Sequence, residues 1–533
     1  MTVGRSADPT LAPLNFLLVL TDQQRADHTG FGGNRVLQTP HLDSLAARAT
    51  VFAQAYATNP ICMPNRATIL TGRMPSAHGT RFNGLSLDWD AATFVRELRR
   101  AGYRTGLVGK AHFQNMGLGA DMMDTIRPTW ATREATGPRQ PAGWDLLEND
   151  QRYRDGDVEL PDDFYGFDHV ELAVGHADLA SGHYVHWLRD HGVDPATVQG
   201  PHDPGASFDG WWQIWRTAVP EHLYPTAYVR ERTVAYLQDA AAGGQPFFLQ
   251  CSFPDPHHPF TPPGRYYDLY DPADVALPTT FDDPLTDALP HLRRWRATRG
   301  QEPPAIPVLP FSPDERVFRE AAAKEYGAIT MIDDALGEIL ATLETTGLAE
   351  RTVVVFTSDH GEMFGDHGLM LKAAMHYRGA LGVPLIVADP RRPAAAGRVC
   401  DALVGSIDLA QTFLDLAGVD AYQGMQGRSL VPLLADPAAE HRSALLVEED
   451  EPFDLAGVGR SLRMRTLLTA EGRISRIAGA GRGEVFDLVA DPDELVNRQG
   501  DPGASDLEHA LTEQLALALM EADDTGNIPS FLA

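Results

Sequence analysis

Polar side chains follow four short apolar segments of the sequence, at the point where each segment ends. They are Asp22 and Gln23 after residues 16–20, Lys110 and His112 after 105–108, His257 and His258 after 246–251, and Asp359 and His360 after 353–357. A single Asp in such a place usually caps a turn, and a single His is usually a satisfied loop residue. If the four segments are parallel strands, however, the side chains meet beyond the carboxyl ends, where open α/β sheets bind ligands.

Four of these side chains indicate a metal site. Asp22, Gln23, Asp359 and His360 offer oxygen and imidazole ligands, which suit one hard or borderline divalent cation. The histidine shifts the expectation toward Mn²⁺, so we expect Ca²⁺ or Mn²⁺ in preference to Mg²⁺. Zinc is less favoured because no cysteine pair supports it.

The segment from Ile61 to Gly72, ICMPNRATILTG, combines a cysteine with the signals of a helix start. Pro64 suits the first turn of a helix and Gly72 suits its end, which places Cys62 at or just before the helix N-terminus. Backbone N–H groups there favour a thiolate or a bound oxyanion, and Arg66 can bind the same anion. An isolated Cys-x-Pro-x-Arg match is equally consistent with a small buried cysteine that only packs.

Together with the four segment ends, this motif resembles the sulfatase family of the alkaline-phosphatase-like superfamily, close to arylsulfatases and phosphonate monoester hydrolases. The resemblance extends over nearly the whole chain. It includes residues 18–23, 109–112, 256–260, 358–362, 365–368, Lys372, 383–385, 486–488, 491–494 and Asn497. An ordered series of this length is not a chance match.

The resemblance implies that a separate maturation enzyme oxidises Cys62 to formylglycine, whose hydrated form is a geminal diol. One diol oxygen would bind the metal and attack sulfur, which makes position 62 a metal ligand as well as the nucleophile. The other oxygen would expel sulfate as the aldehyde forms again. Arg66 would hold and polarise the diol. Asn65 stands where many sulfatases have Ser or Ala.

The resemblance also assigns roles around the sulfuryl group. Lys110 and Lys372 would neutralise its oxygens, and His257 would protonate the leaving alcohol or phenol. His112 resembles the base that assists release of the sulfated intermediate. Asn83 resembles a substrate-contacting asparagine, although an Asn-Gly pair is equally a turn.

Three functions follow from these residues. Lys110 and His112 favour hydrolysis of sulfate esters, of aryl or other small organic alcohols. The metal set with Gln23 and His360 resembles that of phosphonate monoester and phosphodiester hydrolases, which would use the same nucleophile. In the third, the chain is a catalytically silent anion-binding protein in which Cys62 stays a thiol.

Apolar runs that alternate with helical patterns predict the fold class, an α/β fold with a large, mostly parallel sheet flanked by helices. A further parallel strand is expected at 385–388, and helices at 91–100 and 325–346. The catalytic domain is predicted over 1–434, with insertions near 129–225 and 272–313. Residues 435–533 predict a smaller α+β domain that has a short antiparallel sheet and a final helix at 506–522.

The amino-acid composition excludes several classes of binding partner. With 44 Lys and Arg against 73 Asp and Glu, the formal charge of −29 disfavours nucleic acid and anionic membrane surfaces as partners. Three widely spaced cysteines suit neither a disulfide framework nor a zinc site. With no secretory or membrane-spanning segment at 14–20, we expect a cytoplasmic protein. The tryptophan-rich insertion or the last helix could form a homo-oligomer contact.

Overall fold

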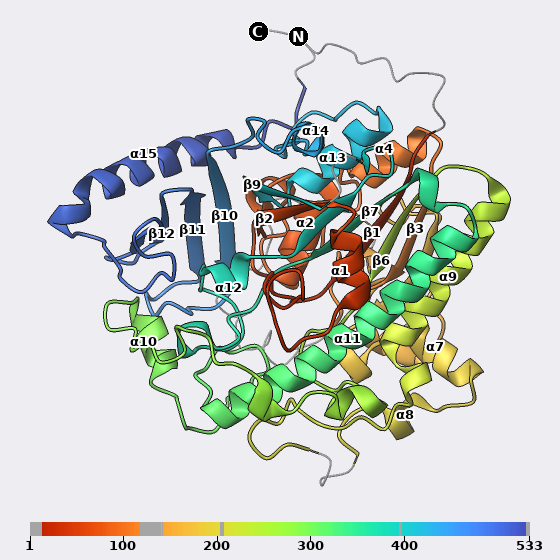
Figure 1. The fold of residues 1–533 in the computed structure, drawn as a ribbon, viewed down its shortest axis with the longest axis horizontal. Coiled ribbons are helices and arrows are strands. Elements are labelled where there is room, and N and C mark those ends of the chain that lie inside the picture. The colour runs from red at the N-terminus through yellow and green to blue at the C-terminus, as the bar shows by residue number, and fades with distance from the viewer. Residues whose placement is uncertain (1–12, 118–139, 141, 203–206, 394–396, 529–533) are drawn as a thin grey trace.

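A nine-stranded sheet forms the centre of the protein in this computed structural model, which describes residues 13–117, 140, 142–202, 207–393 and 397–528 (Figure 1). Its strands are β1 (Asn15–Thr21), β2 (Thr50–Tyr56), β3 (Arg104–Gly109), β4 (His169–Val174), β5 (Ser181–Gly182), β6 (Phe247–Ser252), β7 (Thr352–Ser358), β8 (Leu385–Ala388) and β9 (Arg398–Gly405). Their order is β5-β4-β3-β6-β1-β7-β8-β2-β9. Parallel pairing joins β4, β3, β6, β1 and β7 in one continuous block.

Helices cover both faces of this sheet (Figure 1). One face carries α1 (Pro40–Ala46), α9 (Pro225–Gly243) and α11 (Glu315–Thr345), and the other carries α2 (Cys62–Thr71), α4 (Phe94–Arg100) and α13 (Asp408–Ala417). Strands β1, β6 and β7 are buried along their whole length, which explains why their sequences are continuous apolar runs. The predicted fold class is confirmed.

The predicted helices exist, with shifted boundaries. Helix α4 begins at Phe94, where the Thr93 side chain accepts a hydrogen bond from the Arg96 N–H. Helix α11 begins ten residues before the predicted Glu325, because Asp314 caps it by accepting from the Val317 N–H. Helix α2 ends at Gly72, whose φ of 62° lies in the left-handed region that glycine adopts without strain.

The prediction of a parallel strand at 385–388 was correct in position and wrong in direction. Strand β8 is antiparallel to both of its neighbours, β7 and β2. The chain leaves β7 and stays at the carboxyl edge of the sheet, where Gly361 N–H donates to the Ala380 carbonyl. Without a crossover back to the other edge, the next strand has to run in the opposite direction.

A second sheet of four antiparallel strands lies beside the first (Figure 1). It consists of β10 (Ala444–Glu451), β11 (Leu462–Thr469), β12 (Gly472–Ile477) and β13 (Glu484–Asp487). Helix α15 (Ser505–Glu521), within one residue of the predicted bounds, packs on this sheet through Leu511 and Leu515. The sheet falls inside the predicted C-terminal domain, while the boundary at 434 stays a prediction.

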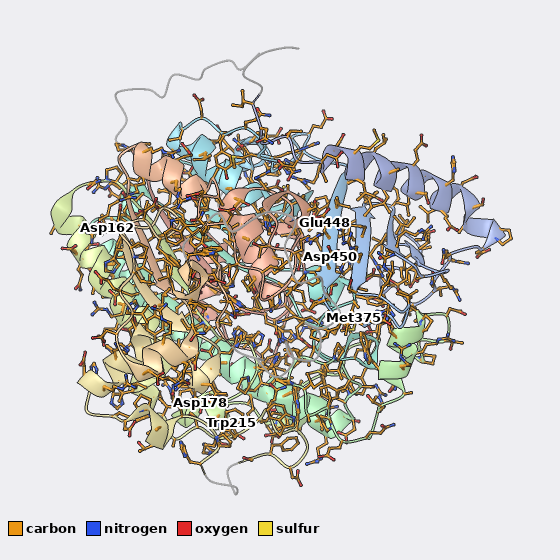
Figure 2. All side chains as sticks on the ribbon, turned by 180° about the vertical axis from the view of Figure 1, so that it is seen from behind. Asp162, Asp178, Trp215, Met375, Glu448 and Asp450 are labelled. Carbon is orange, nitrogen blue, oxygen red and sulfur yellow. The ribbon has the colours of Figure 1, made fainter. Side chains whose placement is uncertain are left out.

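The tryptophan-rich insertion packs onto the main body in its described part. Trp211 and Trp215 are buried, and the Trp215 indole donates to the buried Asp178 carboxylate at 3.1 Å (Figure 2). Residues 129–139, 141 and 203–206 of this insertion lie outside the described residues. Of the helices that the structure describes, none is long and apolar enough to cross a membrane.

Candidate active site

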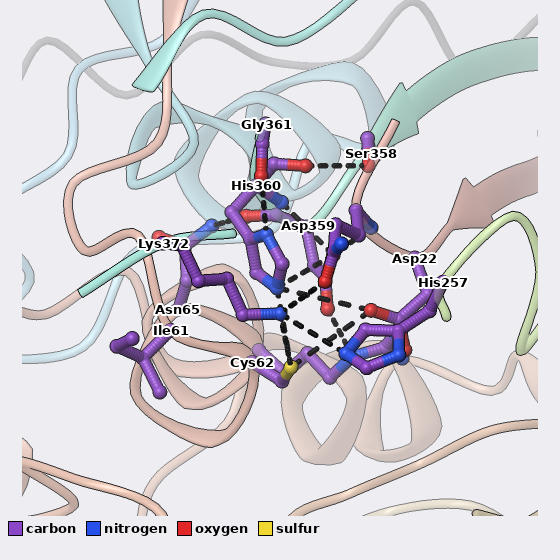
Figure 3. A network of polar contacts seen from close by, with 12 residues as sticks. Asp22, Ile61, Cys62, Asn65, His257, Ser358, Asp359, His360, Gly361 and Lys372 are labelled. Carbon is purple, nitrogen blue, oxygen red and sulfur yellow. Dashed lines mark hydrogen bonds and ion pairs between the residues drawn. The ribbon is translucent and has the colours of Figure 1, made fainter. Parts of the chain in front are cut away.

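Five neighbouring strands deliver polar side chains to one place at the carboxyl edge of the sheet. In sheet order, β4 is followed by His176, β3 by Lys110, β6 by the segment that holds His257, β1 by Asp22 and β7 by Asp359. Figure 3 shows how several of these side chains converge on Cys62. The expectation that separate strand ends share one site is therefore met in the geometry.

Four side chains at the centre can hold a metal ion. Ligand atoms of Asp22, Cys62, Asp359 and His360 all lie within 4.8 Å of one another, and all four residues are buried. The His360 Nδ1 lies 2.8 Å from the Gly361 carbonyl, which directs Nε2 toward the Cys62 sulfur at 3.1 Å. Two carboxylates and one imidazole suit a hard or borderline divalent cation.

The charge states of these groups also fit a cation. Burial opposes ionisation of Asp22, but Lys110 and Arg66 hold the pKa of its carboxyl well below the usual value. Burial lowers the pKa of His360 to about 4, so the imidazole is neutral, as a ligand must be.

Gln23, the fourth predicted metal ligand, lies at the same place with its amide fully engaged. Its backbone N–H donates to Asp359 Oδ1 at 3.0 Å, and its Oε1 accepts from Lys372 Nζ at 2.5 Å. Its Nε2 donates to Glu362 Oε2 at 3.2 Å. The role of Gln23 as a metal ligand stays a prediction.

Cys62 is the first residue of α2, as the motif predicts, and the whole of this helix is buried. Burial raises the pKa of its thiol to about 11, despite the ammonium of Lys372 whose Nζ lies 3.7 Å from the sulfur. Burial therefore opposes the thiolate form, and the expectation that the helix N-terminus favours a thiolate or a bound oxyanion stays a prediction.

Arg66 connects three strand ends from inside the site. Its Nε donates to Asp359 Oδ2 at 2.7 Å, and its Nη1 donates to the Lys110 carbonyl at 2.9 Å and to Ser252 Oγ at 3.0 Å. Its Nη2 is buried and forms an ion pair with Asp22 Oδ2 at 3.5 Å, but it has no hydrogen-bond partner among the described residues. A further acceptor at the position of Cys62 would satisfy that donor.

Lys110 supplies a cation next to a second group of ligand-type side chains. This group contains Asp22, Cys62, His176 and His257. Lys110 Nζ forms an ion pair with Asp22 Oδ2 and lies 2.7 Å from His176 Nε2. The protein's own ammonium therefore neutralises this side of Asp22.

His112 follows Lys110 on a backbone that Glu148 holds in place. The Glu148 carboxylate accepts hydrogen bonds from the N–H groups of His112, Phe113 and Gln114, at 2.5, 2.8 and 2.9 Å. The His112 Nδ1 is buried without a partner among the described residues. Burial, and then Lys110, keep the pKa of His112 well below its usual value.

His257 lies beside the other lysine. Its Nε2 is 3.0 Å from Lys372 Nζ, and its Nδ1 forms a hydrogen bond with the carbonyl of His258. Burial, followed by the neighbouring His176, lowers the pKa of His257 well below its usual value.

Asn83 is exposed near the start of α2, with its side-chain carbonyl accepting from the Met63 N–H at 3.1 Å. This contact orders the helix N-terminus, and substrate contact stays a prediction. Asn65 accepts from Ser406 Oγ at 2.7 Å and donates to the Asp359 carbonyl. It thereby fixes α2 to the end of β7.

Lys372 lies in a strained loop that the second sheet holds. Leu371, Ala373 and Ala374 have φ of 71°, 84° and 54°, in the left-handed region that side chains disfavour. Glu449 of β10 accepts from the Ala374 N–H at 2.8 Å and pairs with His376 Nε2 at 2.8 Å.

Sequence reasoning missed His176, Glu362 and Glu449. The signal for His176 was present, since it follows the apolar residues Leu172 to Val174 as the other strand-end residues follow theirs. Glu362 stood inside a recognised motif, and its carboxylate accepts from the Phe364 N–H at 3.0 Å. Glu449 had no local signal, because its partners are distant in the sequence.

Comparison with known proteins gives matches over nearly the full length. The sulfatase family model matches residues 14–419, and the model of the N-sulphoglucosamine sulphohydrolase C-terminal region matches residues 365–521. An arylsulfatase of Clostridium perfringens is 27% identical over 494 residues, covering 91% of this chain and 89% of its own. A multifunctional alkaline phosphatase superfamily protein of Trinickia caryophylli is 28% identical, with 96% of both chains covered.

Solved structures of related hydrolases also match this chain over nearly its full length. The phosphonate monoester hydrolase of Agrobacterium radiobacter has a TM-score of 0.75 at 26% identity, with 96% of each chain covered. The phosphonate monoester hydrolase of Silicibacter pomeroyi has the same TM-score, identity and coverage.

Proposed function

The chain belongs to the sulfatase family of hydrolases, and we propose that it cleaves sulfate esters of small organic alcohols or phenols. The observation that carries this proposal is the set of three buried cations, Arg66, Lys110 and Lys372, around Cys62 inside a strongly acidic protein. A sulfate monoester presents three terminal oxygens, and three cations together with a metal can neutralise them.

The family typically uses formylglycine and a divalent metal, and the donor set of Asp22, Cys62, Asp359 and His360 fits both. When present, these groups supply the attacking oxygen and part of the charge stabilisation. A maturation enzyme that oxidises Cys62 is then a required partner, and Ca²⁺ or Mn²⁺ is the proposed metal. Arg66 Nη2, which is paired with Asp22 but forms no hydrogen bond among the described residues, would hold the added oxygen at position 62.

The remaining roles, which are binding of the substrate oxygens and proton transfer, fall to lysine and histidine side chains of the protein. Lys372 lies 3.7 Å from the Cys62 sulfur and binds a terminal oxygen of the substrate, as Lys110 does from the side of Asp22. His257 protonates the leaving oxygen through Nε2, the nitrogen that lies 3.0 Å from Lys372 Nζ, while the His258 carbonyl holds its Nδ1. His112, with a free Nδ1, assists release of sulfate.

A second candidate is hydrolysis of phosphonate monoesters or phosphodiesters. The TM-scores of 0.75 to two phosphonate monoester hydrolases favour it, as does the pairing of Gln23 with His360. Such a substrate has two terminal oxygens and a carbon or ester group in the third place. A third cation would gain nothing from that group, so Lys110 argues for the sulfate.

The test is kcat/KM for an aryl sulfate against the matching aryl phosphonate monoester, on one metal-loaded preparation with conversion of Cys62 quantified by mass analysis. We expect preference for the sulfate, and Lys110→Met should lower sulfate turnover more than phosphonate turnover. Preference for the phosphonate, with equal losses in Lys110→Met, would favour the second candidate.

Two variants test whether position 62 carries the reaction. Cys62→Ala should abolish both activities, whereas Cys251→Ala removes another fully buried cysteine and should leave activity largely intact. An unmodified thiol at Cys62 in protein from its native host would instead support a silent anion-binding protein.

A further inference from the structure

Three imidazole rings form a stack at the side of the site, here named the histidine stack and consisting of His176, His257 and His258. The ring of His257 lies 3.7 Å from that of His176 and 4.0 Å from that of His258, with interplanar angles of 18° and 29°. His258 is innermost, with its Nδ1 3.1 Å from Gln23 Nε2. His176 keeps 18% of its side chain exposed, whereas the other two are buried. The outer ring of the stack is therefore His176.

The contact with Lys110 fixes the tautomer of His176. Lys110 Nζ lies 2.7 Å from His176 Nε2 and also pairs with Asp22. An ammonium group can only donate, so Nε2 must accept and the ring proton must lie on Nδ1. His176 thus presents a fixed N–H donor on the opposite edge of its ring.

That donor is free in the described part of the structure. No hydrogen bond is formed by His176 Nδ1 there, and the atom is not among the fully buried polar atoms that lack partners. His257, the proposed acid for the leaving oxygen, stacks directly on the same ring. His176 is also the exposed member of the stack, and Nδ1 is the ring nitrogen that Lys110 does not occupy.

The backbone holds the ring rigidly in this place. Gly175 and Ala177 on either side have φ of 96° and 49°. The adjacent Asp178 is buried and accepts from Thr217 Oγ1 at 2.7 Å and from the Trp215 indole at 3.1 Å. A donor that is already fixed loses little entropy when it binds, as a specificity contact requires.

We propose that His176 determines the leaving-group specificity of this enzyme, by donating its Nδ1–H to an oxygen that the substrate carries next to the sulfated oxygen. The inference rests on the proposed function and deepens it. The substrate class is then the sulfate esters of vicinal diols, sugars or ortho-oxygenated phenols, in preference to plain aryl sulfates.

A matched pair of substrates tests this contact. We would compare 2-methoxyphenyl sulfate with 2-methylphenyl sulfate, which are similar in size and differ in the acceptor oxygen. The wild-type enzyme should prefer the methoxy compound by about fivefold to tenfold in kcat/KM, the range of one neutral hydrogen bond. The preference should appear mainly in KM if the contact forms already in the bound substrate.

Two variants distinguish the contribution of His176 Nδ1 from that of His176 Nε2. His176→Asn places an amide N–H near the position of Nδ1 and should keep most of the preference. His176→Gln places a carbonyl oxygen near the position of Nε2, where it can still accept from Lys110, and should bring the ratio close to one. Thermal unfolding of both variants checks that the site remains folded.

The outcomes are distinct. A wild-type enzyme that cleaves both sulfates without preference overturns the inference alone, as does a His176→Gln variant that keeps the preference. Because the first of these needs no variant, it stands even if a substitution fails to fold. A wild-type enzyme that cleaves neither sulfate overturns the proposed function, and the inference with it.

Discussion

Lys110 and Lys372 bring the same ammonium group to Cys62 from two differently built regions. Lys110 directly follows β3, which pairs in parallel with β4 and β6, and its position follows from the regular geometry of the sheet. Lys372 lies in a loop with successive positive φ angles, braced by Glu449 from the second sheet. One half of the site is thus set by local structure and the other by a distant region.

This difference shows what the second sheet contributes. Strand β10 carries Glu448 and Asp450 beside Glu449 (Figure 2), and its register places Glu449 opposite Met464 of β11. Since backbone strain of the kind seen around Lys372 persists only when surrounding contacts impose it, the second sheet takes part in building the candidate active site.

The largest expected effects come from the lysines themselves. Lys110→Ala and Lys372→Ala should each lower kcat/KM by about 100-fold to 1000-fold, the usual loss for one preorganised charge contact.

The two substitutions should differ in their effect on the free energy of unfolding. Lys110→Ala removes a buried partner of Asp22 and should cost about 3 kcal/mol in the metal-free protein. Lys372 has no carboxylate partner among the described residues. If urea unfolding gave the same loss of unfolding free energy for both variants, the two lysines would not differ in their structural role.

Loss of the Glu449 contacts that hold the Lys372 loop should lower kcat less than loss of Lys372 itself. Glu449→Ala frees the Ala374 N–H and His376, and we expect kcat to fall by about 10-fold to 100-fold, as for other supporting contacts. The matched control is Glu448→Ala on the same strand, which loses contacts to Ser76 and should keep kcat within about threefold. Similar kcat losses in both variants would mean a general effect of the sheet.

A smaller effect, on the pH dependence of stability, is expected at Glu148, which holds the backbone that follows Lys110. Burial raises the pKa of its carboxyl to about 7, against the lowering by three backbone N–H groups. The folded state therefore holds a proton that the unfolded state has lost, and the Glu148 contribution to stability falls as pH rises from about 4.5 to 7. The difference in unfolding free energy between wild type and Glu148→Gln should shrink by about 1–2 kcal/mol between pH 5 and pH 8. Urea titrations at both pH values measure it, and a constant difference would contradict the assignment.

The smallest effect concerns Asn83. If it only orders the start of α2, Asn83→Ala should cost about 1 kcal/mol of stability and change kcat/KM by less than about threefold. A tenfold rise in KM without loss of stability would instead support the substrate contact that the sequence suggests.

The sequence predicts the sheet half of the site well, since Asp22, Lys110 and Asp359 each follow an uninterrupted buried strand. It fails at His176, because β4 begins with the half-exposed residues His169 to Glu171 and reads weakly as a strand. The direction of β8 is not encoded in its composition. The complete burial of Cys62, which raises the pKa of its thiol, could not be predicted either, because only the assembled fold creates it.

The burial of Cys62 also has a consequence for biosynthesis. The residue is closed in by Asp359, His360 and Lys372, and the last of these follows 310 positions later in the chain. If Cys62 is converted to formylglycine as proposed, the maturation enzyme would have to reach it before the nascent chain folds around it. At about 5–20 residues per second, synthesis of that intervening stretch lasts roughly 15 to 60 seconds. On that proposal the rate of translation would limit the time available for conversion, and protein that folds first would keep an unmodified Cys62.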